Sequence, residues 1–196
     1  MENASVQHIR EIQWRRLDEP AHESAALERM TDGWRLRGTV SGTHADGQAY
    51  DLRYAIECAP DWVTRSAAVD GHVADAAIRV TVVRDAATGT WTRDGVAQPQ
   101  LAGCLDVDLQ FSPSTNTLPI RRLGLRPGSR AHVRTAWLRF PGFELVPLEQ
   151  EYHRQNERRY GYESAGGRFR AVLDVDKAGF VTQYGDYWTA EPSNQV

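Results

Sequence analysis

The chain has 196 residues, of which 41% are hydrophobic and 25% are charged, and its formal net charge is −3. This balance is typical of an ordinary globular protein and excludes a disordered chain, a collagen and a coiled coil. A slightly acidic chain also lacks the overall positive charge on which nucleic-acid-binding proteins rely, so we expect no nucleic-acid partner.

Taken in chain order, five segments alternate apolar and polar side chains with a period of two, which is the pattern of half-buried β-strands. These segments are residues 34–40, 49–58, 78–82, 105–111 and 168–175. The alternation is clearest where Tyr50, Leu52 and Tyr54 share one face of a strand, while Asp51 and Arg53 share the other. Each segment is therefore predicted to have one face in a core.

Turns that contain glycine separate the strands, at residues 31–33, 45–47, 93–95, 126–128, 141–142, 165–167 and 177–179. Asp-Gly and Gly-Gly pairs supply the positive φ angles of tight hairpins, so consecutive strands are expected to pair antiparallel. We predict an all-β, mainly antiparallel fold with at most one or two short helices, forming one domain over residues 1–196. The state of residues 20–30 stays open between helix and strand, and the polar residues 112–118 are expected to form a long loop.

Common catalytic and cofactor signatures are missing: the sequence has no GxSxG, P-loop, GxGxxG or HExxH pattern. Cys58 and Cys104 lack CxxC spacing, and the histidines are isolated, so we expect reduced thiols, no metal and no cofactor. No apolar run approaches the ~18 residues of a membrane span, and the first five residues lack a signal-peptide layout. We therefore expect no transmembrane segment and a cytoplasmic location.

Asp106 and Asp108 are the most informative charged pair, because alternate residues of a strand put both carboxylates on one face. Three interpretations stay open: structural ion pairs with arginines such as Arg121, Arg122 or Arg134, polar contacts to a ligand, and metal binding or acid–base catalysis. Of these, structural ion pairs are the interpretation that we favour.

Residues 101–123 read LAGCLDVDLQFSPSTNTLPIRRL, a run too particular in Cys, Asp, Asn and paired Arg to follow from strand patterning. It resembles the signature of the bacterial family described as "putative glycolipid-binding", once a domain of unknown function. Further matches are residues 62–66, 147–152, 160–162 and 169–174, so that the resemblance covers about 34–188. Ser112 stands where the family pattern has threonine, a change that keeps the hydroxyl.

The resemblance implies a spiral β-roll or incomplete barrel, related in shape to periplasmic lipoprotein carriers, with a cavity suited to an amphiphile. Asn116 and Thr117 offer amide and hydroxyl groups that match sugar hydroxyls. Arg121 and Arg122 offer paired N–H donors for phosphate or carboxylate. The alternative for this loop is structural, with Asn116 turning its own backbone and Arg121 paired to an aspartate inside the protein.

Our first hypothesis is a binding or carrier protein for an amphiphilic ligand such as a glycolipid, with the tail inside the roll and the headgroup held at its mouth by Asn116 and Arg121. The predicted ligand-binding residues are Asp106, Asp108, Asn116, Thr117, Arg121, Arg122, Tyr152, Tyr160 and Trp188. The second hypothesis is an enzyme of unknown reaction with its polar centre at Asp106, Asp108, Asn116 and Arg121. The third is a structural module that forms a homodimer through an exposed strand edge.

Overall fold

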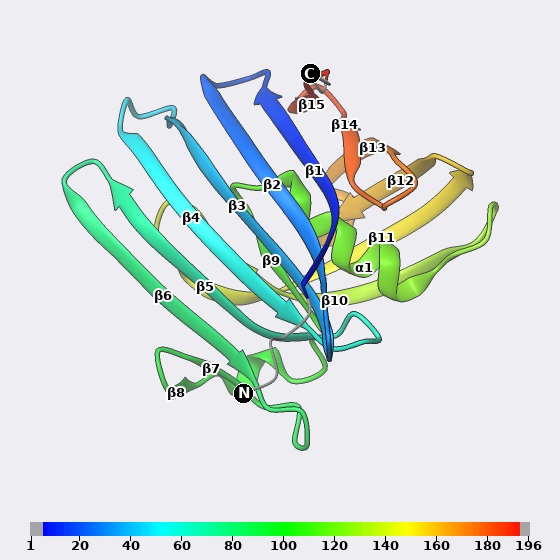
Figure 1. The fold of residues 1–196 in the computed structure, drawn as a ribbon, viewed down its shortest axis with the longest axis horizontal. Helices are drawn as coiled ribbons and strands as arrows, with labels where there is room; N and C mark the ends of the chain where they lie inside the picture. Colours follow the sequence, from blue (N-terminus) through cyan, green and yellow to red (C-terminus); the bar gives the residue numbers. More distant parts are fainter. Residues whose placement is uncertain (1–5, 193–196) are drawn as a thin grey trace.

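The computed structural model describes residues 6–192, and it confirms an all-β protein with one short α-helix (Figure 1). The strands are β1 (Gln7–Arg16), β2 (Ala21–Met30), β3 (Gly33–Thr43), β4 (Ala49–Cys58), β5 (Thr64–Val73), β6 (Ala76–Arg84), β7 (Trp91–Arg93), β8 (Val96–Ala97), β9 (Asp106–Leu109), β10 (Arg130–Leu138), β11 (Leu145–Asn156), β12 (Arg159–Ser164), β13 (Phe169–Val175), β14 (Val181–Tyr184) and β15 (Trp188–Ala190). The helices are α1 (Thr117–Leu123) and three 3₁₀ turns, η1 (Pro99–Leu101), η2 (Pro113–Asn116) and η3 (Ala165–Gly167).

All fifteen strands belong to one curved sheet, in the order β8-β7-β6-β5-β4-β3-β2-β1-β15-β14-β13-β12-β11-β10-β9. Consecutive strands pair antiparallel, as the glycine turns predicted, except that β9 pairs parallel with β10. The sheet does not close into a barrel. One end of the sheet approaches β5, where the Thr64 amide donates to the Leu105 carbonyl at 3.0 Å, just before the end strand β9.

The predicted alternation is confirmed most clearly in β4, whose inward residues Tyr50, Leu52 and Tyr54 are at most 3% exposed. On the neighbouring strand β3, Gly38 faces Tyr54. A Cβ atom at Gly38 would lie 2.5 Å from the Tyr54 hydroxyl oxygen, so the glycine leaves the space that the tyrosine ring needs. Residues 21–30, left open by the sequence, form strand β2, and the residues Ala21, Ala25 and Leu27 face the core.

The long loop expected at 112–118 is wrong, because this stretch forms η2 and the first turn of α1. Ser112 caps η2, its hydroxyl oxygen accepting from the Ser114 amide at 3.1 Å. Gly124, in the left-handed conformation, ends α1. The polar residues of 112–117 are buried rather than solvated. Side chains of distant strands bond to three of them: Glu23 to Ser112, Tyr54 to Ser114 and Tyr152 to Asn116.

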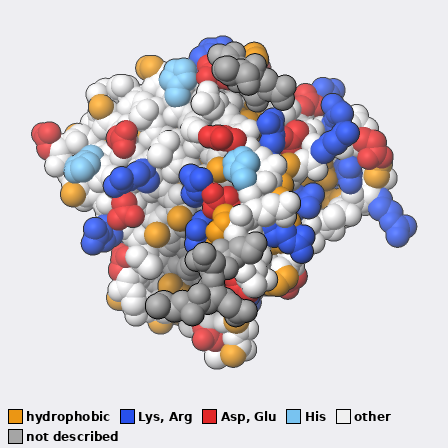
Figure 2. Space-filling model, viewed as in Figure 1, with side chains coloured by type: hydrophobic (Ala, Val, Ile, Leu, Met, Phe, Trp, Pro, Cys, Tyr) orange, Lys and Arg blue, Asp and Glu red, His pale blue; other side chains and the backbone are white. Residues whose placement is uncertain are grey.

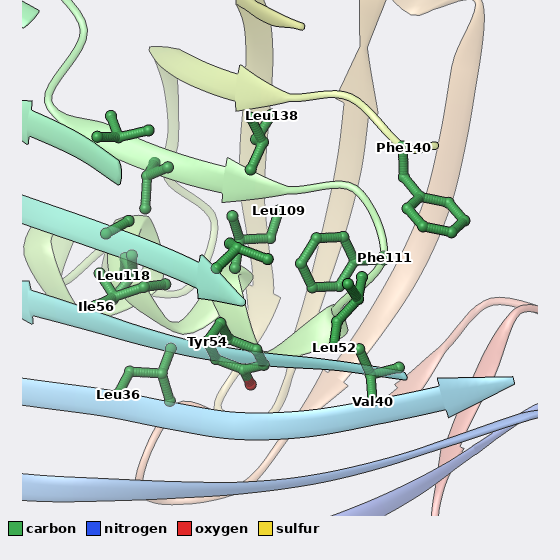
Figure 3. Close-up of a cluster of buried hydrophobic side chains, with 14 of the residues drawn as sticks. Leu36, Val40, Leu52, Tyr54, Ile56, Leu109, Phe111, Leu118, Leu138 and Phe140 are labelled. Atoms are coloured by element: carbon green, nitrogen blue, oxygen red, sulfur yellow. The ribbon is translucent and has the colours of Figure 1, made fainter. Parts of the chain in front are cut away.

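Helix α1 links the two hydrophobic clusters of the fold. Leu118 packs in the larger cluster, formed mainly by β1–β6, β9 and β10, while Ile120 packs in the smaller one with residues of β10–β14. Figure 3 shows the larger cluster, in which Leu109 and Phe111 fill the space between β4 and β10. Across residues 6–192, no helix is long and apolar enough to span a membrane.

Candidate functional site

A cavity of about 340 Å³ lies where the two halves of the curved sheet face each other. Its lining residues come from β1, from the turn between β3 and β4, and from β9–β15 with their connecting segments, which are far apart in the sequence. Its aromatic lining residues are His44, Phe111, Trp137, Phe140, Tyr162, Phe169, Tyr184, Tyr187 and Trp188. Its polar ones are Arg16, Asp108, Gln110, Ser112, Asn116 and Ser164. Such a combination of rings and a few polar groups is typical of a small-molecule site.

Four of the aromatic rings form one continuous wall. The ring centroids of Tyr162 and Phe169 are 6.0 Å apart, those of Phe169 and Tyr187 5.4 Å, and those of Tyr187 and Tyr184 6.1 Å. Most of these contacts are edge to face, which holds the rings rigidly. Tyr187 is 38% exposed and forms the rim of the wall. A rigid wall of this kind can receive a sugar face or an alkyl chain.

Asp108 supplies the only carboxylate among the lining residues. Its Oδ2 accepts a 2.5 Å hydrogen bond from Nε2 of Gln150 on β11, whereas no residue within 6–192 donates to Oδ1. Burial raises the pKa of Asp108 to about 6, against the effect of the Gln150 bond, and the nearby Asp106 charge adds to the rise. Oδ1 can therefore accept a hydrogen bond from a ligand in the cavity.

Asn116 is held in place by Tyr152. The Tyr152 hydroxyl donates to Oδ1 of Asn116 at 2.8 Å, and Nδ2 of Asn116 donates to the Pro113 carbonyl at 3.2 Å. One N–H of the amide then has no acceptor in the described part of the chain. Because Asn116 lines the cavity, this N–H is a second unused hydrogen-bonding group there.

Asp106 forms a buried ion pair with Arg122 of α1. Nε and Nη2 of Arg122 donate to the two carboxylate oxygens at 2.9 and 2.6 Å. Asp106 is 0% exposed, and burial raises the pKa of its carboxyl while the Arg122 bonds oppose the rise. Of the arginines considered, the one that pairs with Asp106 lies on a helix and not on a neighbouring strand. The pair fixes α1 against β9.

A buried cluster of one carboxyl and three hydroxyl groups lies behind the cavity, and it was not predicted from the sequence. Oε1 of Glu23 on β2 accepts from the hydroxyls of Tyr54 and Ser112, each at 2.6 Å, and Ser114 lies 2.7 Å from both hydroxyl oxygens. Burial raises the pKa of Glu23 to about 8, although these hydroxyls lower it in part. The available signal was a glutamate at an inward position of β2, between Ala21 and Ala25.

The structure brings only some of the predicted ligand-binding residues together. Asp108, Asn116 and Trp188 line the cavity. Tyr152 and Thr117 are buried, Tyr152 as the partner of Asn116. Arg122 is bound to Asp106. Arg121 and Tyr160 line a different hollow beyond α1, so Asn116 and Arg121 do not meet at one mouth.

The family model described as "Putative glycolipid-binding" matches residues 11–190 of the chain. The chain belongs to this family. Every residue that lines the cavity falls within the matched range, and the long motif 101–123 supplies Asp108, Gln110, Ser112 and Asn116 to it. The family's motif therefore forms the polar side of the cavity.

A solved structure shows the same fold for a protein that is similar to this chain. It is the crystal structure of a DUF1089 family protein from Pseudomonas aeruginosa, which is 34% identical and superposes with a TM-score of 0.74. The match covers 84% of this chain and 88% of that chain. No curated protein matches the chain in sequence.

Proposed function

We propose that the protein binds an amphiphilic small molecule, a glycolipid or a related glycoside, and that the sugar headgroup occupies the cavity lined by Asp108, Asn116 and Trp188. The observation that carries this proposal is the joining of an aromatic wall to two unused hydrogen-bonding groups, Oδ1 of Asp108 and an N–H of Asn116. Sugars present hydroxyls at their edges and apolar faces between them. Both kinds of surface meet a partner in this cavity.

The size of the cavity favours a headgroup over a whole lipid. Its volume, about 340 Å³, is near the lower end of the range for ligand pockets. The space between β4 and β10 is filled by Leu109, Phe111 and their neighbours (Figure 3), so we no longer place the tail inside the roll. In this proposal the tail leaves past the exposed ring of Tyr187.

The enzyme hypothesis required Asp106, Asp108, Asn116 and Arg121 around one cavity. In the described residues Asp106 is bound to Arg122, and Arg121 lines another hollow, so a pair of carboxylates for acid–base chemistry is not assembled.

The homodimer through a strand edge stays a prediction. Native mass spectrometry reports the dimer and any lipid that co-purifies in one experiment.

Thermal-shift screening tests the proposal with alkyl glycosides, phospholipids and fatty acids. A ligand at one hundred times its dissociation constant stabilises the folded state by about 2.7 kcal/mol, which raises the Tm of a chain of this size by roughly 5–10 °C. We expect this rise for an alkyl glycoside. The rise should shrink in Tyr187→Ala and persist in Tyr187→Phe, which keeps the ring. If none of the three classes shifts the Tm, the proposal is wrong.

A further inference from the structure

A second hollow, of about 580 Å³, lies at the C-terminal end of α1 and shares no lining residue with the cavity described above. Three separate parts of the chain bring cations to it: Arg121 from α1, Arg154 and Arg158 from the end of β11 and the turn before β12, and Lys177 from the turn between β13 and β14. Lys177 is the only lysine of the chain. Figure 2 shows Lys and Arg side chains gathered over the region where Figure 1 places α1 and β10–β13.

Three of these four cations have no anionic partner in the described part of the chain. Within residues 6–192, Arg121, Arg158 and Lys177 form no ion pair, and their side chains donate no hydrogen bond to a protein group. All three are exposed. Arg154 differs, because it donates to the backbone carbonyl of Leu125 at 2.6 Å and so remains fixed in the wall.

The two acidic side chains of this hollow are already engaged. Oδ2 of Asp176 accepts from Arg10 at 2.9 Å, and its Oδ1 accepts from the backbone amides of Ala178 and Phe180 at 2.9 and 3.0 Å. Glu157 lies 3.3 Å from Nη2 of Arg154. Neither carboxylate contacts Arg121, Arg158 or Lys177, whose charges therefore remain uncompensated.

The side chain of Arg121 is also positioned, although it makes no hydrogen bond. Its guanidinium carbon lies 5.1 Å from the centroid of the Trp62 ring, a cation–π contact. A Cβ atom at Gly179 would lie 2.9 Å from Cδ of Arg121, so the glycine leaves room for the arginine stem. The end of a short helix favours nearby cations, but that effect does not account for Arg158 and Lys177, which belong to other elements.

We propose that this hollow binds a phosphate-type anion, with Arg121, Arg158 and Lys177 as its ligands. Guanidinium groups offer paired N–H donors that match two phosphate oxygens, and an ammonium adds a point charge. The anion is either a free phosphorylated small molecule or the phosphate of a lipid headgroup, which share this chemistry. The site is separate from the sugar cavity and does not depend on it.

Titration with inorganic phosphate tests the site, with chloride at equal ionic strength as the reference. The indole N–H signal of Trp62 in a ¹⁵N–¹H spectrum reports on the site, because Arg121 lies over its ring. We expect a saturable shift of this signal with phosphate only. Because a charge-assisted hydrogen bond contributes about 1.5–3 kcal/mol, Arg121→Gln and Arg158→Gln should each weaken the affinity roughly tenfold or more.

Arg79→Gln is the matched control, since Arg79 is an exposed arginine on β6 with an 87% exposed side chain. It should leave the phosphate affinity unchanged. The variants replace exposed side chains, and thermal melts verify that they fold.

Co-flotation with phosphatidylcholine vesicles, with and without phosphatidic acid, separates the two sources of phosphate. Binding of free phosphate or of phosphatidic acid supports the site. Binding of neither overturns it, and so does a phosphate affinity in Arg121→Gln and Arg158→Gln equal to that of the wild-type protein.

Discussion

The hydroxyl of Tyr54 donates a 2.6 Å hydrogen bond to Oε1 of Glu23, although both side chains lie in the hydrophobic interior. Glu23 is 2% exposed, and no cation contacts it among the described residues. Its other oxygen, Oε2, has no hydrogen-bond partner there. Since Ser112 bonds to the same carboxyl and lines the cavity, this cluster supports the cavity from behind. A buried acid without a cation makes the stability of the fold depend on pH.

Glu23→Gln should flatten part of the dependence of stability on pH. The folded protein holds the Glu23 proton up to about pH 8, whereas the unfolded chain releases it near 4.5. Between these values the folded state binds more protons, so its free energy of unfolding falls as pH rises, by at most roughly 1.4 kcal/mol per unit. Urea melts of both proteins from pH 4 to pH 9 measure the difference. Parallel curves for the two proteins would contradict this account of Glu23.

Tyr54→Phe should lower the free energy of unfolding by about 1–3 kcal/mol, because it removes a donor from a buried acceptor. The control is Tyr187→Phe, which removes an exposed hydroxyl with no hydrogen-bond partner in the described structure and should change stability by less than about 0.5 kcal/mol. Chemical denaturation compares the two. Equal values for both variants would show that the hydroxyl of Tyr54 contributes nothing to the cluster.

Asp106→Ala should lower the free energy of unfolding by roughly 3–5 kcal/mol, because it leaves Arg122 without its buried partner. Asp174→Ala is the matched control. Asp174 accepts two similar bonds from Arg159, at 2.7 and 3.0 Å, but on the surface, where such a pair contributes about 0–1 kcal/mol. A small loss for Asp106→Ala together with loss of ligand binding would instead assign Asp106 to the site.

The affinity for an alkyl glycoside should fall as the pH drops below about 6, the pKa of Asp108. Above this pH the carboxylate accepts a charge-assisted hydrogen bond from a sugar hydroxyl, and protonation weakens that bond. Asp108→Asn should bind weakly and show no such dependence. Calorimetric titrations between pH 5 and pH 8 measure both proteins. An affinity that stays constant across this range in the wild-type protein would exclude Asp108 as the acceptor.

The strands could be predicted because their signals are local. Alternation and glycine turns lie within a few residues of one another, and they gave β4 with its observed bounds and most of the antiparallel pairing. The parallel pairing of β9 with β10 could not be predicted in this way. Turn η2 and the start of α1 were missed because residues 112–117 are mostly polar, and only partners such as Glu23 and Tyr152 make the burial of Ser112 and Asn116 favourable.

The candidate site could be predicted in part. The motif 101–123 named Asp108 and Asn116, which line the cavity, because these residues are exceptional in a strand-rich sequence. It also named Arg121, which belongs to α1 but lines the other hollow. Whether a residue of η2 or α1 reaches the cavity or the other hollow depends on the direction in which its turn of the helix faces. A loop prediction could not supply that direction.

The indole signals of the six tryptophans test the proposed cavity most directly. Trp137 and Trp188 line it, whereas the indoles of Trp14, Trp34 and Trp91 donate to backbone carbonyls elsewhere and Trp62 stacks on Trp34. In a ¹⁵N–¹H spectrum, octyl glucoside below its micelle concentration should shift the signals of Trp137 and Trp188 saturably and leave the other four in place. Unchanged signals of Trp137 and Trp188, or shifts confined to the other tryptophans, would contradict a headgroup site in this cavity.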